Sequence, residues 1–180
     1  MLLQPSYIEI VTIALKEIKT GSDRVAGIVT PAFLDDLPGI VLRNHLHQND
    51  ELLNDMLKPG GKLGEFGIKI DMAFLLGIIG DRARKDLHRI RKIRNEFAHK
   101  AGLDSFDKSP IRDWAMDLTI PNWFKGEIKS SDNAEPKVRI PSNKDIAKLS
   151  APRGRFSVSC KCFFAALASI EPRAPVNPRF

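Results

Sequence analysis

The sequence predicts an all-α protein, a single-domain helical bundle of about six to seven helices. Two observations carry this prediction. Apolar residues recur at helical spacing with few strand signals, and Gly, Pro, Ser or Asp residues mark the ends of the periodic segments. A chain of 180 residues that is 43% hydrophobic and 28% charged can bury one core. We therefore treat residues 1–180 as one domain.

The first predicted helix runs from Pro5 to about Lys19 and ends before Gly21, because glycine commonly follows the last turn of a helix. The N-terminal sequence is apolar but has no basic lead and no small-residue cleavage site, so we expect no signal peptide. The longest apolar run, Met72–Ile79, is too short to cross a bilayer. We expect a cytoplasmic protein without a membrane segment.

The second predicted helix carries both helix-promoting and helix-breaking signals. Ser22 or Asp23 offers the side-chain oxygen of an N-cap, and apolar residues then recur at helical spacing to about His47. Pro31 and Pro38 lie inside this stretch, and each proline removes a backbone donor and clashes with the preceding turn. We therefore expect a kink or break near Pro38, after which the helix resumes.

Two further helices are predicted in the next segment. A short one, capped by Asn49 or Asp50, runs to Leu57 and is followed by a glycine-rich loop. A long one runs from about Leu63 to Ile79 and is apolar on nearly all sides. Neighbouring elements usually enclose a helix of this kind, so we expect it to be a central, buried helix.

The next predicted helix is strongly basic and extends from Asp81 to Ala98 or His99. From Asp81 to Lys100 the chain has eight Lys or Arg residues and three acidic ones, which accounts for most of its net charge of +6. The apolar residues of this helix fall on one stripe: Ala83, Leu87, Ile90, Ile93, Phe97 and Ala98. Arg94 falls inside that stripe, whereas Arg82, Lys85, Arg89 and Lys92 occupy the opposite, solvated side.

Ser109, a natural N-cap, and Pro110 predict the start of a further helix. Proline suits the first helical position because the N–H it lacks would have no partner within the helix. The buried face of this helix would consist of Ile111, Trp114, Ala115 and Leu118.

The C-terminal third alternates between polar and apolar segments. Residues 125–154 are polar and contain prolines, which predicts a long loop. Residues 155–170 predict the last helix, and the tail 171–180 should fray. The core is therefore expected in residues 22–120 together with the last helix.

Cys160 and Cys162 are the two cysteines of the chain and form a CxC pair. Two cysteines this close in sequence are poorly placed to form a disulfide that stabilises the fold. No cluster of His or Cys residues provides the ligands of a zinc site. We expect reduced thiols, no metal and no cofactor. His45, His47 and His88 are interpreted as surface residues without chemistry.

Arg94 raises the main functional question, because a guanidinium among apolar residues requires an anionic partner. One interpretation pairs it with a carboxylate of its own chain, such as Asp71 or Asp35, while His99 interacts with the last carbonyls of its helix. The other treats Arg94, Asn95 and His99 as one unit. There, histidine would move protons and arginine would hold a phosphate, which are the parts needed to cleave RNA without a metal.

Longer segments resemble the mannitol operon repressor family of small bacterial all-α proteins. The order "SDRVAGIVTPAFLDDL", "GKLGEFGIKIDMAFLLGIIG" and "DLHRIRKIRNEFAHKAGLDSFD" matches that family from Ser22 to Leu118, with a fainter match at "GRFSVSCKCFF". The resemblance implies negative regulation of a carbohydrate-uptake operon. Because no convincing DNA-reading helix-turn-helix is evident, we expect regulation through a protein or RNA partner and doubt direct sequence-specific DNA binding.

The segment "RNEFAH" is also similar to the Arg-x4-6-His signature of HEPN-type helical domains, many of which are dimeric, metal-independent endoribonucleases. This resemblance implies that Arg94 and His99 are a catalytic pair supported by Asn95, in a homodimer with a shared cleft. A nucleic-acid partner would also contact the basic residues of the same helix, namely Arg91, Lys92, Arg89 and Lys85. The repressor-type interpretation leads because its match covers more of the chain.

Overall fold

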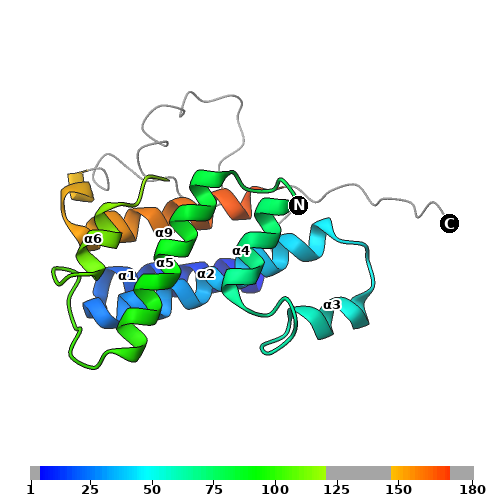
Figure 1. Ribbon diagram of the computed structural model, residues 1–180, viewed down its shortest axis with the longest axis horizontal. Helices are drawn as coiled ribbons and strands as arrows, with labels where there is room; N and C mark the ends of the chain where they lie inside the picture. The colour runs from blue at the N-terminus through cyan, green and yellow to red at the C-terminus, as the bar shows by residue number, and fades with distance from the viewer. Residues whose placement is uncertain (1–4, 121–146, 171–180) are drawn as a thin grey trace.

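The computed structural model describes residues 5–120 and 147–170, with only the backbone described for residues 5–10. Within these residues the chain folds into seven α-helices and one short 3-10 helix, and no strand occurs among them (Figure 1). The predicted all-α helical bundle is therefore confirmed. The predicted tail and most of the predicted 125–154 loop lie outside the described residues.

Helix α2 is the central helix of the bundle. Helix α1 (Pro5–Thr20) precedes it, and α2 (Asp23–His45) packs against α1, α4, α5 and α9. As predicted, the Ser22 hydroxyl caps it by accepting a hydrogen bond from the Val25 amide at 3.2 Å. Pro31 and Pro38 are both buried inside this helix, which continues through them. Of the expected kink or break near Pro38, the break is wrong, because packing on several sides outweighs the two lost backbone hydrogen bonds.

By length and composition, α2 is the one helix of the described part that could cross a membrane. Half of the qualifying stretch is buried inside the bundle. The central helix of a bundle has this apolar character for packing alone, so it is weak evidence for a membrane span.

Helix α3 (Asp50–Leu57) confirms the short predicted helix. The Asn49 side chain caps it by accepting a hydrogen bond from the Leu52 amide at 3.0 Å. The helix projects from the side of the bundle and leads into the loop that precedes α4 (Figure 1).

Helix α4 (Phe66–Leu75) is shorter and less enclosed than the predicted helix from Leu63 to Ile79. Its C-terminal end comes early because Gly77 adopts a φ of 71°, and the amides of Ile78 and Ile79 both turn back to the carbonyl of Ala73. The prediction of a buried central helix is wrong. Helix α4 packs against α2 and α5 on one side of the bundle, and its other side remains exposed.

Helix α5 (Asp81–His99) agrees with its predicted range and packs against α2, α4 and α6. It approaches α2 very closely at Gly27, where an added β-carbon would lie 2.2 Å from the ring of Phe97. Glycine at this position therefore lets the two helices meet.

The C-terminal elements complete the bundle. Helix α6 (Ile111–Met116) begins one residue after Pro110, and the Ser109 hydroxyl donates to Asp113 instead of capping the helix. The 3-10 helix η1 (Ala147–Ser150) and helix α9 (Pro152–Ala168) replace the last part of the predicted loop. Helix α9 starts earlier than predicted because Pro152 occupies its first turn, a position that proline favours.

Three phenylalanines from distant segments join α5, α9 and the loop before α6. The ring of Phe106 lies 5.0 Å from that of Phe97 and 4.8 Å from that of Phe156, centroid to centroid. All three side chains are fully buried, and each such burial contributes about 1.5–3 kcal/mol to stability. This cluster fixes α5 in the core, so that the opposite side of α5 faces α4.

Candidate functional site

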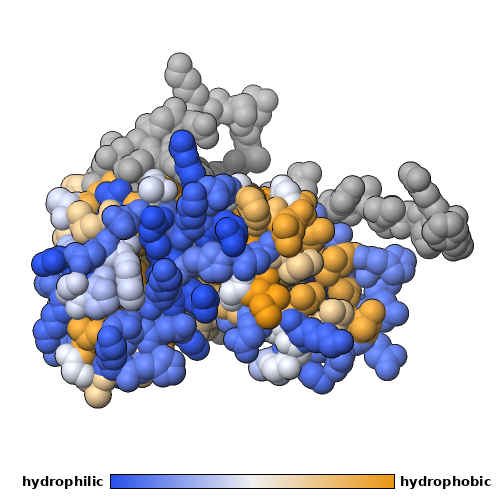
Figure 2. Space-filling model, in the orientation of Figure 1, coloured by the Kyte–Doolittle hydropathy of each residue, from blue (hydrophilic) through white to orange (hydrophobic). Residues whose placement is uncertain are grey.

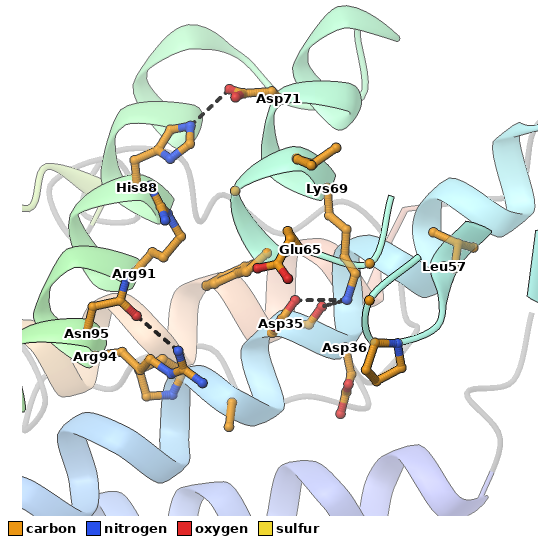
Figure 3. A pocket seen from close by; sticks show the side chains of 18 of the residues that line it. Asp35, Asp36, Leu57, Glu65, Lys69, Asp71, His88, Arg91, Arg94 and Asn95 are labelled. Atoms are coloured by element: carbon orange, nitrogen blue, oxygen red, sulfur yellow. Dashed lines mark hydrogen bonds and ion pairs between the residues drawn. The ribbon is translucent and has the colours of Figure 1, made fainter. Parts of the chain in front are cut away.

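A cavity of about 800 Å³ lies between α2, α4 and α5, with the loop from α3 to α4 along one side (Figure 3). Its lining is more polar than apolar. Helix α5 contributes one wall, made of His88, Arg91, Arg94, Asn95 and His99. Helices α2 and α4 and the loop contribute carboxylates and one lysine to the facing side.

The three residues of the predicted catalytic unit, Arg94, Asn95 and His99, all line this cavity. Arg94 and His99 are exposed, and Asn95 is half-buried. Arg94 Nη1 donates a hydrogen bond to Asn95 Oδ1 at 3.0 Å. The three side chains therefore share one space that solvent can reach, and their catalytic role stays a prediction.

Arg94 is aligned with the apolar stripe of α5, but the expectation that apolar residues enclose it is wrong. The buried residues of α5 include Ala83, Leu87, Ile90, Ile93 and Phe97, whereas Arg94 and Ala98 are exposed. At the level of Arg94 the cavity takes the place that a packing side chain would otherwise fill. A guanidinium in that position keeps its contact with solvent and needs no buried counter-charge.

The carboxylates expected to neutralise Arg94 are both engaged elsewhere. Asp71 accepts hydrogen bonds from Arg84 Nε at 2.7 Å and from His88 Nε2 at 2.9 Å. Asp35 forms an ion pair with Lys69, with 2.9 Å between Nζ and Oδ1. Across residues 5–120 and 147–170, no ion pair involves Arg94. The interpretation in which a carboxylate of the same chain neutralises Arg94 is therefore wrong for both Asp71 and Asp35.

Arg91 is the second arginine on this wall and lies one turn before Arg94. Its guanidinium packs against Gly67 of α4, where an added β-carbon would come within 3.3 Å of it. Arg91 Nε is buried and has no hydrogen-bond partner. Within the described part of the chain, Arg91 also forms no ion pair. The guanidinium groups of Arg91 and Arg94 therefore line the cavity, and neither is paired with a carboxylate.

The facing side of the cavity carries acceptors. Lys69 of α4 is buried and its ammonium is held by the carboxylate and the carbonyl oxygen of Asp35. Burial raises the pKa of the neighbouring Asp36, although Lys69 partly offsets this, and the charge of Asp35 adds to it. Glu65 precedes α4 and points toward the centre of the cavity (Figure 3).

His88 and Asp71 form a polar bridge between α5 and α4 at one end of the cavity (Figure 3). The hydrogen bond from His88 lowers the pKa of the Asp71 carboxyl; burial works against it, and the hydrogen bond from Arg84 adds to the lowering. The expectation that His88 is a surface residue without chemistry is wrong, because this residue is half-buried and bonded to Asp71. Sequence spacing could not reveal this pair, because it forms only when the turn after α4 brings the two helices together.

The residues predicted to contact nucleic acid differ in their surroundings. Lys85 pairs with Asp81 at 2.6 Å, and Arg89 pairs with Asp86 at 3.0 Å. Arg91 lines the cavity, and Lys92 is exposed. The structure does not gather the four into one free basic surface, since two of them already have carboxylate partners.

No cluster of His, Cys, Asp or Glu in the described part of the chain has the arrangement needed for a metal ion. Cys160 and Cys162 are buried on α9, away from the cavity lining, and are not joined by a disulfide. Burial raises the pKa of the Cys160 thiol well above its ordinary value, which disfavours the reactive thiolate.

No protein-family model matches the sequence, and no curated protein sequence does either. Among solved structures, the fold is similar to a chain in the X-ray structure of the MtlR-HPr complex from Escherichia coli. The TM-score is 0.62 at 15% sequence identity, over 89% of this chain and 99% of that one. The likeness therefore extends across the whole bundle and supports an MtlR-like fold.

Proposed function

We propose that this chain is a regulatory protein of the mannitol-operon-repressor type, which lowers gene expression by binding a partner protein. The observation that carries the proposal is the likeness in fold to MtlR, a protein solved in complex with HPr. That likeness agrees with the family that the sequence resembles from Ser22 to Leu118. A partner of the HPr kind is therefore the first candidate for this chain.

An exposed apolar surface supports a protein partner. Figure 2 shows apolar side chains gathered over α4 and the adjoining end of α2. We call this surface the apolar patch; the large exposed apolar residues in this part of α2 and in and just after α4 are Ile40, Ile68, Leu75 and Leu76, of which Leu75 is 75% exposed. A gathering of large apolar side chains on the surface commonly marks a protein contact.

The ion pairs of α5 favour a protein partner over a nucleic acid. Besides Lys85 and Arg89, this helix pairs Arg84 with Asp71, and Glu96 pairs with Lys100 just after the helix. Nucleic-acid affinity depends on cations that are free to replace the counterions of phosphates. Carboxylates beside these cations reduce that contribution, although the chain as a whole is basic.

The apolar patch can be tested with HPr from the organism that encodes this chain. Leu75→Asp should weaken the binding of HPr at least tenfold, as measured by isothermal titration calorimetry, because it places a charge in the contact. The matched control is Ile13→Asp on α1, a residue that is 44% exposed outside the patch and should bind as the wild type does. Equal affinity of the two variants for HPr would exclude the apolar patch as the HPr-binding surface.

A metal-independent ribonuclease of the HEPN type is the second candidate, because Arg94, Asn95 and His99 line one cavity and Arg94 is not neutralised. In this proposal the 2′-hydroxyl of RNA attacks the adjacent phosphorus and the 5′-oxygen leaves. The products are a 2′,3′-cyclic phosphate and a free 5′-hydroxyl. His99 would accept the proton of the 2′-hydroxyl and deliver a proton to the leaving 5′-oxygen, and Arg94 would stabilise the charge on the phosphoryl oxygens. Formation of a homodimer belongs to the same proposal.

A further inference from the structure

The two unpaired arginines of α5 indicate that the cavity is built for an anion. Arg91 and Arg94 are three residues apart, so they lie on adjacent turns of one helix, and both side chains line the same cavity (Figure 3). No carboxylate of the described residues pairs with either guanidinium, and Arg91 Nε is buried without an acceptor. Two guanidinium groups without a carboxylate partner leave donors that an anion in the cavity can use.

The chemistry of the two arginines favours phosphate over carboxylate. A carboxylate has two oxygens in one plane and carries a single negative charge, which one guanidinium fork can neutralise. A phosphate monoester has three terminal oxygens, so it can accept from two forks at once. Two guanidinium groups with few partners of their own therefore match a phosphate.

The facing side of the cavity indicates the rest of the ligand. Asp36 and Glu65 line the cavity, and neither forms an ion pair within the described part of the chain. Asp35 is held by Lys69, which leaves these two carboxyl groups as acceptors for donors on a ligand. Hydroxyl groups supply such donors. The volume of about 800 Å³ lies within the roughly 300–1,000 Å³ of small-molecule sites.

We propose that this cavity binds a small phosphate ester that bears hydroxyl groups, with the phosphate held by Arg91 and Arg94 and the hydroxyls by Asp36 and Glu65. The site would make the chain responsive to a phosphorylated metabolite. The proposal stands independently of HPr binding, because it rests on the cavity lining alone.

Calorimetry with three probes tests this proposal: glycerol 3-phosphate, inorganic phosphate and glycerol. Glycerol 3-phosphate should bind the wild-type chain and raise its melting temperature, inorganic phosphate should bind more weakly, and glycerol should not bind measurably. Arg91→Gln and Arg94→Gln should each weaken the binding of both phosphate probes at least tenfold. Asp36→Asn should weaken the binding of glycerol 3-phosphate and leave that of inorganic phosphate within twofold.

The matched control is Lys92→Gln, which removes an exposed charge between the two arginines in sequence but outside the cavity lining. It should bind both phosphate probes as the wild type does. Circular dichroism confirms folding, and Arg91→Lys replaces any Arg91→Gln variant that fails to fold. The absence of binding by both phosphate probes, or an equal loss in Lys92→Gln, would overturn the proposal.

Discussion

Asp86 of α5 accepts a hydrogen bond from the backbone amide of Ile120, 34 residues further along the chain, at 2.7 Å. The same carboxylate oxygen accepts from the Thr119 amide at 2.7 Å and from its hydroxyl at 3.1 Å. The other carboxylate oxygen accepts from Arg89. Asp86 is fully buried, so this one side chain ties the segment after α6 to the helix that carries the cavity wall.

Replacing Asp86 tests this connection. Asp86→Ala should lower the free energy of unfolding by about 3 kcal/mol, because the buried amide of Ile120, the part-buried amide of Thr119 and the cation of Arg89 lose their acceptor. Urea denaturation followed by circular dichroism measures the change. Asp81→Ala is the control, since it removes an exposed carboxylate from the first turn of the same helix, with its pair to Lys85, and should cost less than about 1 kcal/mol. Equal losses in the two variants would contradict the role of Asp86.

The contact between α2 and α5 makes opposite predictions for two glycines of one helix. Gly27→Ala should destabilise the fold by about 1–3 kcal/mol, because the added carbon would collide with the Phe97 ring. Gly39→Ala should stabilise it by about 0.5–1 kcal/mol, since its nearest neighbour is a Lys69 side-chain atom at 3.7 Å and alanine favours the helix. The melting temperatures of both variants, measured by thermal unfolding, test these opposite changes in stability. A stabilised Gly27→Ala variant would mean that α2 and α5 are further apart.

The positions of most helices could be predicted from the sequence, because caps and apolar spacing are local properties. Contacts between segments that are distant in the sequence could not be predicted in this way. Asp86 reads as one of several charges on a basic helix, and nothing near it in sequence indicates that the amides of Thr119 and Ile120 will meet it. Its burial depends on how the segment after α6 returns to α5.

Arg94 and α4 show a second limit of sequence periodicity. A helical projection assumes that neighbouring helices pack evenly along the whole length. Beside Arg94 the bundle leaves a cavity instead, so a residue aligned with the apolar stripe is exposed. Helix α4 is apolar on most sides, but it lies at one side of the bundle, where Leu75 meets solvent. The sequence did predict that Arg94, Asn95 and His99 lie near one another, and all three line one cavity.

The Asp71 carboxyl should titrate below its ordinary pKa of 3.8, because His88 and Arg84 donate hydrogen bonds to its charged form. A folded-state pKa below the unfolded value gives stability that is present above the unfolded pKa and is lost as the pH falls through the folded pKa. His88→Ala should move the midpoint upward in a carbon-13 NMR titration of the Asp71 carboxyl. His99→Ala, which has no contact with Asp71, should leave it unchanged. The same midpoint in all three proteins would contradict the His88–Asp71 bond.

The ribonuclease candidate makes a separate prediction. Purified wild-type chain incubated with total RNA and a metal chelator should yield fragments that end in 2′,3′-cyclic phosphate. His99→Ala should fold normally and reduce the rate at least a hundredfold, because it removes the proton-transferring group. His47→Ala provides the control, since that histidine lies outside the cavity lining. Equal and negligible cleavage by the wild type and both variants would exclude this function.

Titration of the wild-type chain with HPr by isothermal calorimetry tests the central claim most directly. Escherichia coli MtlR with its own HPr serves as the positive control, because those two proteins form the solved complex. The proposal predicts saturable binding of HPr from the organism of this chain, with a Kd below about 100 µM. The absence of binding heat at several hundred micromolar HPr, with a working positive control, would contradict it.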